Sequence, residues 1–342
     1  MKGKIPVLLL FGPTGSGKTE FLEQLFTGSD PVCPAEVISA DSMQVYRGMD
    51  IGTAKPSPEL LSALSHHLIN IRSPQEQFNA GEFVRLADEK AADIFRRGKL
   101  PVVSGGTGFY LSNFMLGLPP APPSDPAIRQ ALQEELRIRG AAALAGELAA
   151  CDPLSAGRIH LNDEYRLLRA LEVYRLSGRP LSSFPLQGIH GVTGSAPGRP
   201  LYRFLLIGLK RPREEVYRRI DLRCQQMFRE GLPGEVQRLW EEGLRPGDPG
   251  IKAIGYREFF LEDREGRWRQ REDLAGVEAI VARNSRRYAK RQITYFAMLP
   301  GVRWISAGST PGEDDGAERI RRELTVFLSS EPPDSLFSRN CR

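Results

Sequence analysis

A glycine-rich segment near the start of the chain has the residues best suited to chemistry. Its sequence, GPTGSGKT, fits the pattern G-x-x-x-x-G-K-[ST]. In such a phosphate-binding loop (P-loop), backbone N–H groups face an anion, the lysine adds a positive charge and the threonine hydroxyl can coordinate Mg²⁺. We therefore expect Thr19 to be the metal ligand. The residues expected to hold the phosphates are Gly12, Pro13, Thr14, Gly15, Ser16, Gly17, Lys18 and Thr19.

The loop predicts phosphate binding but no particular reaction, because NTPases, kinases and other transferases share it. A second candidate is Asp41, which ends the apolar run Val37 to Ala40. Its carboxylate could bind a metal or act as a general base. Alternatively, it could simply cap the turn that follows a strand, and the residues themselves leave these interpretations open.

The elements around the loop must place it at the edge of a sheet. Residues 7–11 are continuously apolar, as in a strand buried on both faces, and a helix is expected to start near Gly17. Similar runs at 100–103 and 204–207, with a helical pattern at 81–97, predict alternating strands and helices. The expected fold class is α/β: a P-loop NTPase-like core with a parallel sheet flanked by helices.

A proline-rich break interrupts this pattern. The stretch LPPAPPSDP, residues 118–126, cannot form the interior of a helix or strand. Helical patterns follow at 127–139, 141–149 and 163–176, with Asn162 as the expected N-cap of the last, and residues 188–200 are expected to form a loop. The expected organisation is a core of residues 1–118 and 201–330, an all-helical insertion of residues 119–200 and a disordered tail of residues 331–342.

Composition favours a folded cytoplasmic protein. Of 342 residues, 41% are hydrophobic and 26% are charged, and no apolar run approaches the roughly 20 residues of a membrane span. The four cysteines are widely spaced, which predicts neither a zinc site nor a disulfide framework. The net charge of +5 is mild, so its distribution is more informative than its sum.

Basic residues cluster late in the chain, where a helix is expected. No acid lies between Glu278 and Glu313, which favours contact with RNA phosphates over a solvated helix face. A second basic cluster, at 210–223, includes acids, so structural ion pairs are the alternative there. The late cluster consists of Arg283, Arg286, Arg287, Lys290 and Arg291.

The segment ISADSMQVYRGMDIGTAKP, residues 38–56, closely resembles the tRNA dimethylallyltransferase (tRNA isopentenyltransferase) family. The resemblance covers about residues 5–306 and implies transfer of a dimethylallyl group from dimethylallyl diphosphate to the exocyclic amine of the adenine 3′ to the tRNA anticodon. Diphosphate is then the leaving group. Further matching segments are His66–His67, Gly105–Thr107 followed by Tyr110, Arg158–Asp163, Arg166, Arg169–Val173, Ile254–Glu258 and Lys290–Thr294.

The resemblance assigns roles to particular residues. It implies that Asp41 is the catalytic carboxylate, assisted by Thr107 and Lys18, and that Arg166 and Arg223 complete a diphosphate clamp with Mg²⁺ on Thr19. Without the resemblance, Thr107 could be a helix cap and the arginines surface residues. Together with the basic helix, the expected tRNA contacts are Asp41, Ser42, Met43, Gln44, Thr107, Arg129, Tyr165, Arg166, Leu167, Leu168, Arg169, Lys252, Ala253, Ile254, Gly255, Tyr256, Arg257, Arg287, Lys290 and Arg291.

Three alternatives stay open: an isopentenyltransferase acting on free adenylate, a P-loop small-molecule kinase, and a nucleotide-gated RNA-binding module. The first is typically shorter and lacks much of the insertion at 119–200, which argues against it. The expected protein is a bacterial-type cytoplasmic monomer, without membrane contact, whose partners are the tRNA anticodon stem-loop and dimethylallyl diphosphate.

Overall fold

A computed structural model describes residues 4–184, 199, 201–263, 265–308 and 315–330. The chain forms two compact units: a core unit, Met1–Leu116 with Pro197–Arg342, and a helical unit, Gly117–Ala196. The insertion predicted from the sequence, residues 119–200, differs from the helical unit by a few residues at each end. Of the loop expected at 188–200 only residue 199 is described, and the tail expected to be disordered, 331–342, lies outside the described residues.

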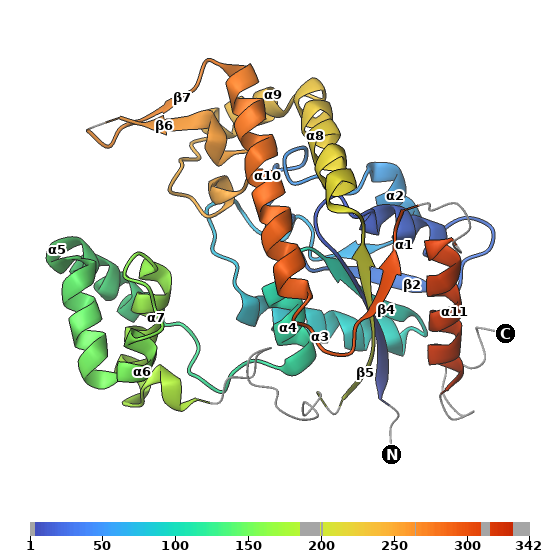
Figure 1. Ribbon diagram of the computed structural model, residues 1–342, viewed down its shortest axis with the longest axis horizontal. Helices are drawn as coiled ribbons and strands as arrows, with labels where there is room; N and C mark the ends of the chain where they lie inside the picture. Colours follow the sequence, from blue (N-terminus) through green and yellow to red (C-terminus); the bar gives the residue numbers. More distant parts are fainter. Residues whose placement is uncertain (1–3, 185–198, 200, 264, 309–314, 331–342) are drawn as a thin grey trace. The chain divides into compact units, whose positions relative to one another are not determined.

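A parallel sheet forms the centre of the core unit (Figure 1), and it confirms the predicted fold class. Six strands follow one another in the order β3-β2-β4-β1-β5-β8, and every neighbouring pair is parallel. β1 is buried over its whole length, which explains its continuous apolar run. The strands are β1 (Ile5–Phe11), β2 (Ala35–Ser39), β3 (His66–His67), β4 (Leu100–Gly105), β5 (Tyr202–Lys210) and β8 (Arg303–Ser306).

Helices cover both faces of this sheet. On one face, α1 (Lys18–Phe26) and α11 (Gly316–Ser329) contribute buried apolar side chains to one cluster with Leu8 and Leu10 of β1. On the other, α3 (Ala80–Arg96) and α4 (Gly108–Leu116) meet through stacked Phe83 and Tyr110 rings, 4.6 Å apart. The alternating strand–helix pattern read from the sequence therefore corresponds to a buried sheet.

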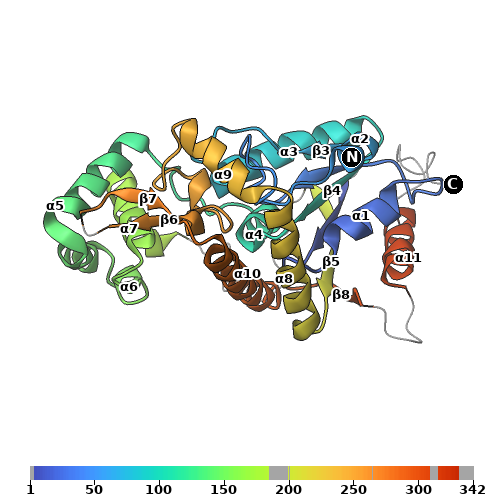
Figure 2. The ribbon, with the colours of Figure 1, turned by 90° about the horizontal axis from the view of Figure 1, so that it is seen from above.

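Three further helices follow β5. They are α8 (Arg213–Arg229), α9 (Leu232–Glu241) and α10 (Leu274–Phe296), and α8 and α10 lie side by side in both views (Figures 1 and 2). α9 was not predicted, nor were the short turns η2 (Gly250–Lys252) and η3 (Arg257–Phe259) or the hairpin of β6 (Phe260–Glu262) and β7 (Trp268–Gln270). The turns and the hairpin strands are too short to show periodicity in the sequence, whereas α9 has an amphipathic pattern, with Leu232, Val236 and Leu239 buried, that the prediction missed.

The helical unit contains α5 (Pro126–Cys151), α6 (Pro153–Ala156), α7 (Glu164–Ser177) and the turn η1 (Leu181–Ser183). α5 is broken at Gly140, where φ is 76° and ψ is 163°, so two predicted helices meet at this kink. The predicted N-cap of α7 was wrong: the cap is Asp163, whose carboxylate accepts the Arg166 N–H at 3.1 Å. A carboxylate suits the positive end of a helix better than the Asn162 amide does.

Among the described residues, no helix combines the length and apolar character needed to cross a bilayer. The longest, α5, buries a few leucines of the core of the helical unit and exposes charged side chains elsewhere.

Candidate active site

Three loops meet at the carboxyl end of the sheet. Because β4 lies between β2 and β1, the segments that follow these strands are neighbours. Asp41 follows β2, Thr107 follows β4 and the P-loop follows β1. A Cβ on Gly105 would lie 2.2 Å from the Ala40 carbonyl oxygen, so only glycine allows the first two loops to approach this closely.

Thr107 joins two of these loops. Its hydroxyl accepts the Ser42 N–H at 3.0 Å, and its own N–H donates to the Ala40 carbonyl at 3.1 Å. Its carbonyl accepts the N–H groups of Tyr110 and Leu111 at the start of α4. The Thr107 side chain is therefore directed at the segment after β2, where Asp41 lies, and not at the first turn of its own helix.

The P-loop has the context predicted for it, with a strand before it and a helix after it. Gly17 precedes α1 with φ of 98°, a conformation that favours glycine. The Lys18 ammonium group folds back over the loop and donates to the carbonyls of Gly12 and Pro13 at 2.9 and 3.1 Å. The residues expected to hold phosphate are thus brought together around the start of α1.

Positive charge is concentrated beside this loop. The Arg223 guanidinium lies on α8 and donates to the Thr14 hydroxyl at 3.3 Å. Burial and the charge of Arg223 lower the pKa of Lys18 to about 8, while Asp41 opposes this effect. Burial lowers the pKa of Arg223 as well, again opposed by Asp41. Two partly buried cations and one carboxylate leave an excess of positive charge, which a diphosphate would neutralise.

Two arginines that sequence reasoning did not assign support the loop from outside. Arg211 Nε donates to the Ser16 carbonyl and Arg219 Nε donates to the Gly15 carbonyl, both at 2.9 Å. Each also pairs with an acid, since Arg211 contacts Glu215 and Arg219 contacts Glu20. The basic cluster at 210–223 therefore combines structural ion pairs with the anchoring of the P-loop.

The Asp41 carboxylate has two oxygens with different surroundings. Oδ1 accepts the N–H groups of Met43 and Gln44 at 2.9 and 3.3 Å, so it caps the turn after β2. Within the described part of the chain, Oδ2 makes no hydrogen bond. The capping role that the sequence left open is thus real, and one oxygen remains available for chemistry.

Two polar side chains of helix α10, Gln292 and Tyr288, point into the site, and neither was predicted from the sequence to be a site residue. Gln292 is buried, accepts the Thr14 N–H at 2.8 Å and donates to the Gly106 carbonyl at 2.7 Å. One turn earlier, burial and the Asp41 charge raise the pKa of Tyr288 to about 12, partly offset by the side chains of Thr107 and Gln292. Gln292 belongs to the matched segment Lys290–Thr294, where it is the polar residue of the buried face.

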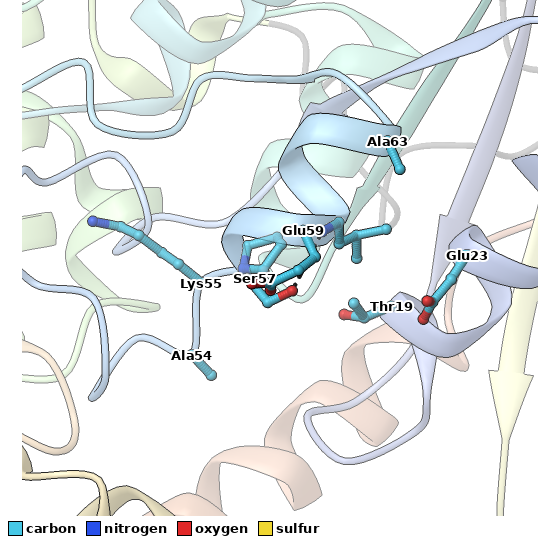
Figure 3. Close-up of a pocket in the computed structure, with 9 residues that line it drawn as sticks. Thr19, Glu23, Ala54, Lys55, Ser57, Glu59 and Ala63 are labelled. Atoms are coloured by element: carbon cyan, nitrogen blue, oxygen red, sulfur yellow. Dashed lines mark hydrogen bonds between the residues drawn. The ribbon is translucent and has the colours of Figure 1, made fainter. Parts of the chain in front are cut away.

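A cavity of about 390 Å³ adjoins the P-loop at Thr19 (Figure 3). Figure 3 shows Thr19 and Glu23 of α1 opposite Ser57 and Glu59, the latter on α2 (Pro58–Ala63), with the Lys55 amine turned away. Lys55 instead donates to the Tyr46 carbonyl and to the side chains of Asp50 and Asn70. The lining therefore mixes polar and acidic side chains with apolar ones, among them Leu60 and Ala63, and leaves room for water beside the threonine hydroxyl.

A buried carboxylate on α9 connects the loop after β2 to one of the expected tRNA-binding segments. Glu235 accepts the N–H groups of Asp50, Ile51 and Gly52 at 2.9, 3.0 and 3.3 Å, and the Tyr256 hydroxyl at 2.6 Å. This network fixes the loop after β2 to the segment 252–257. No sequence signal identified Glu235, because a single glutamate on an amphipathic helix is ordinarily a surface residue.

Burial divides the residues expected to bind tRNA. In the segment 252–257, the side chains of Lys252 and Arg257 are exposed, whereas Ala253 and Tyr256 are buried. Leu167 and Leu168 lie in the core of the helical unit. Those buried side chains can support an RNA surface from below, and the expected tRNA contacts of these residues stay a prediction.

The basic face of α10 is mostly free of ion pairs. Arg286 pairs with Asp221, so this member of the cluster has a structural partner. For the other members, no ion pair is formed with any residue that the structure describes. The exposed members are Arg283, Arg287, Lys290 and Arg291.

In the helical unit, the expected RNA contacts lie around the start of α7. The Arg129 guanidinium lies 4.8 Å from the centre of the Tyr165 ring, and Tyr165 is 68% exposed. Arg166 is exposed and pairs with Asp163 at 2.6 Å, while Arg169 donates to Glu172 at 2.8 Å. Arg166 belongs to this unit and not to the core unit, so its expected contact with diphosphate stays a prediction.

The fold and the phosphate cradle define a P-loop protein of the α/β class. Residues 44–298 match the family model described as IPP transferase. The chain is 42% identical over 308 residues to tRNA dimethylallyltransferase of Geobacter sulfurreducens, covering 88% of this chain and 92% of the relative. It is 43% identical over 310 residues to the enzyme of the same name from Syntrophobacter fumaroxidans, covering 90% and 85%. The chain belongs to the IPP transferase family, as the resemblance implied.

Solved structures agree with this assignment. The tRNA isopentenylpyrophosphate transferase of Bacillus halodurans matches with a TM-score of 0.64 and 34% identity, over 95% of this chain and 97% of that one. A eukaryotic dimethylallyltransferase, described as acting on tRNA, matches with a TM-score of 0.75 and 25% identity, over 96% and 80%.

Proposed function

We propose that this protein transfers a dimethylallyl group from dimethylallyl diphosphate to the exocyclic N6 amine of the adenine 3′ to the anticodon in tRNA. A carbon–nitrogen bond forms at the allylic carbon, the carbon–oxygen bond to diphosphate breaks, and the amine loses a proton. The relatives named above are tRNA dimethylallyltransferases, which favours tRNA over free adenylate as the acceptor.

The observation that carries this proposal is the placement of one carboxylate beside two partly buried cations. Lys18 and Arg223 would neutralise charge that grows on the departing diphosphate, together with the N–H groups at the start of α1. The Oδ2 atom of Asp41 would accept the proton of the weakly nucleophilic amine. Its Oδ1 atom keeps the carboxylate oriented by its two backbone hydrogen bonds.

The residues present fit Mg²⁺ bound with the donor. Mg²⁺ usually keeps several waters and takes few protein ligands. Among the described residues there is no cluster of three or more His, Cys, Asp or Glu side chains suited to a metal ion, but Thr19 offers a hydroxyl beside a cavity with room for water. Thr19 would hold the ion, and the metal would supply charge stabilisation for the leaving group.

The acceptor side uses exposed cations. The exposed cations on the basic face of α10 would bind RNA phosphates. The target adenine would be turned out of the anticodon loop to reach Asp41. Arg129, Tyr165 and Arg166 of the helical unit would contact the anticodon arm, and Arg166 would complete the diphosphate clamp. Such a reaction places the enzyme with tRNA in the cytoplasm.

One assay tests the proposal. The protein is incubated with labelled dimethylallyl diphosphate and Mg²⁺, in parallel with unmodified tRNA and with AMP. We expect label in tRNA and none in AMP. Label in AMP alone would indicate the free-nucleotide enzyme, and consumption of ATP without label in either acceptor would indicate a kinase or NTPase.

A further inference from the structure

Gln292 is buried between two loops of the active site, and the proposed mechanism gives it no task. Only 5% of the Gln292 surface is exposed to solvent. Its side-chain oxygen accepts the Thr14 N–H at 2.8 Å, and its side-chain nitrogen donates to the Gly106 carbonyl at 2.7 Å. Both ends of the amide are thus occupied by backbone groups that are far apart in the sequence.

The two partners belong to different halves of the site. Thr14 lies in the P-loop, which would hold the donor. Gly106 precedes Thr107, whose hydroxyl is bonded to the Ser42 N–H next to Asp41, where the acceptor amine would react. The α10 side chain therefore connects the donor loop to the acceptor loop directly.

The chemistry of this connection requires an amide. A carboxylate could accept from Thr14 but would repel the Gly106 carbonyl, and an ammonium group could donate but not accept. The contact is also close, since a Cβ on Gly106 would lie 2.5 Å from the Gln292 side-chain nitrogen. Loss of the amide would leave a buried N–H and a buried carbonyl without partners.

We propose that Gln292 is a positioning residue that couples the donor loop to the acceptor loop and so sets the distance between the allylic carbon and the amine. This inference rests on the proposed function of the site. Gln292 touches neither reacting atom and acts through Thr14 and the Gly106–Thr107 segment. Because reacting atoms must be held about 3–3.5 Å apart in the correct orientation, a small shift between the loops would slow the chemical step.

The test uses Gln292→Met, which keeps the length of the side chain and removes both hydrogen bonds. We expect the single-turnover rate at saturating dimethylallyl diphosphate and tRNA to fall by roughly ten- to a hundredfold. Affinity for inorganic diphosphate should fall severalfold, whereas affinity for tRNA should stay within about twofold because the exposed face of α10 is unchanged. Gln237→Met, the same exchange at an exposed position of α9 where the side chain bonds to Glu241 of that helix, is the matched control and should alter none of these values.

Hydrogen–deuterium exchange separates positioning from general destabilisation. Peptides that contain Thr14 and Gly106 should exchange faster in Gln292→Met, while peptides from β5 and α11 should be unaffected. Should Gln292→Met not fold, Gln292→Asn, which is one methylene shorter and can reach at most one partner, is measured in the same way.

Two results would overturn the inference: a wild-type rate in a folded Gln292 variant, or unchanged exchange in both loops. Failure of the proposed function would look different, because the wild-type protein itself would then not label tRNA. In that case the diphosphate affinity and the exchange of the two loops still decide whether Gln292 couples them.

Discussion

At the residue scale, the two oxygens of Asp41 have different roles: Oδ1 caps the turn after β2, and Oδ2 would accept the proton. Asp41→Asn keeps an oxygen that can accept the N–H groups of Met43 and Gln44, so the turn after β2 should persist. The amide cannot accept a proton from the adenine amine. We therefore expect the single-turnover rate to fall by about 10²–10⁴-fold, with tRNA affinity largely intact.

Rapid-quench measurement with labelled donor and fluorescence anisotropy with labelled tRNA would check these two values. The control is Asp93→Asn on α3, whose carboxylate pairs with Arg96 and Arg97 at the surface. A normal rate in Asp41→Asn would remove this carboxylate from the mechanism.

At the scale of elements, α10 has two faces with separate tasks. Its buried face carries Tyr288 and Gln292 into the site, and its exposed face carries Arg287 and Arg291. Replacing Arg287 and Arg291 by Ala should weaken tRNA binding and reduce the slope of log K against log salt by up to about 2, if each arginine meets a phosphate.

The matched double variant is Arg85→Ala with Arg96→Ala, two exposed arginines on α3 that pair with acids of the same helix. A salt titration of tRNA binding should show a wild-type slope for this control. An equal slope in both double variants would mean that α10 does not contact the RNA.

Helix α9 acts through one residue, Glu235. Glu235→Gln removes the charge that accepts three backbone N–H groups and the Tyr256 hydroxyl, so it should lower the free energy of unfolding by about 2–4 kcal/mol. Urea denaturation measures this change. Glu241→Gln, an exposed position of the same helix, should change it by less than about 0.5 kcal/mol, and a similarly small effect at Glu235 would contradict the role of this network.

At the scale of the whole molecule, an ion cluster joins elements at the other end of the sheet. Glu36 of β2 is buried and bonds to Arg97, which follows α3, to Lys99, which precedes β4, and to His67 of β3. The Arg97 guanidinium, with Lys99 and His67 assisting against the effect of burial, holds the pKa of Glu36 well below its usual range. This carboxylate therefore contributes stability that is present above about pH 4 and is lost as the pH falls.

Glu36→Gln should lower the free energy of unfolding at pH 7 by about 1–3 kcal/mol, because the cations it leaves behind are partly exposed and can be hydrated. The difference from wild type should narrow as the pH falls below about 4. Denaturant titrations from pH 3 to pH 7 would measure this difference. The control is Glu89→Gln, an exposed position of α3. A difference that is constant with pH would exclude the ionised carboxylate as its cause.

The sequence by itself determined the features that depend on neighbouring residues. The P-loop, the buried strand before it and the helical pattern at 81–97 follow from local spacing of apolar, glycine and charged residues. The motif around Asp41 also identified the family. These patterns are readable because a helix or a turn is stabilised by contacts within a few residues.

Only the tertiary structure decided which distant groups complete the site. Gln292 and Glu235 bond to backbone groups some 180 to 280 residues away, and that separation leaves no periodic trace in the sequence. The strand order places β4 between β2 and β1, and this order brings Asp41, Thr107 and Lys18 to one edge of the sheet. Burial, which follows from packing and not from residue type, separated the exposed cations expected to bind tRNA from Leu167, Leu168 and Tyr256, which are buried.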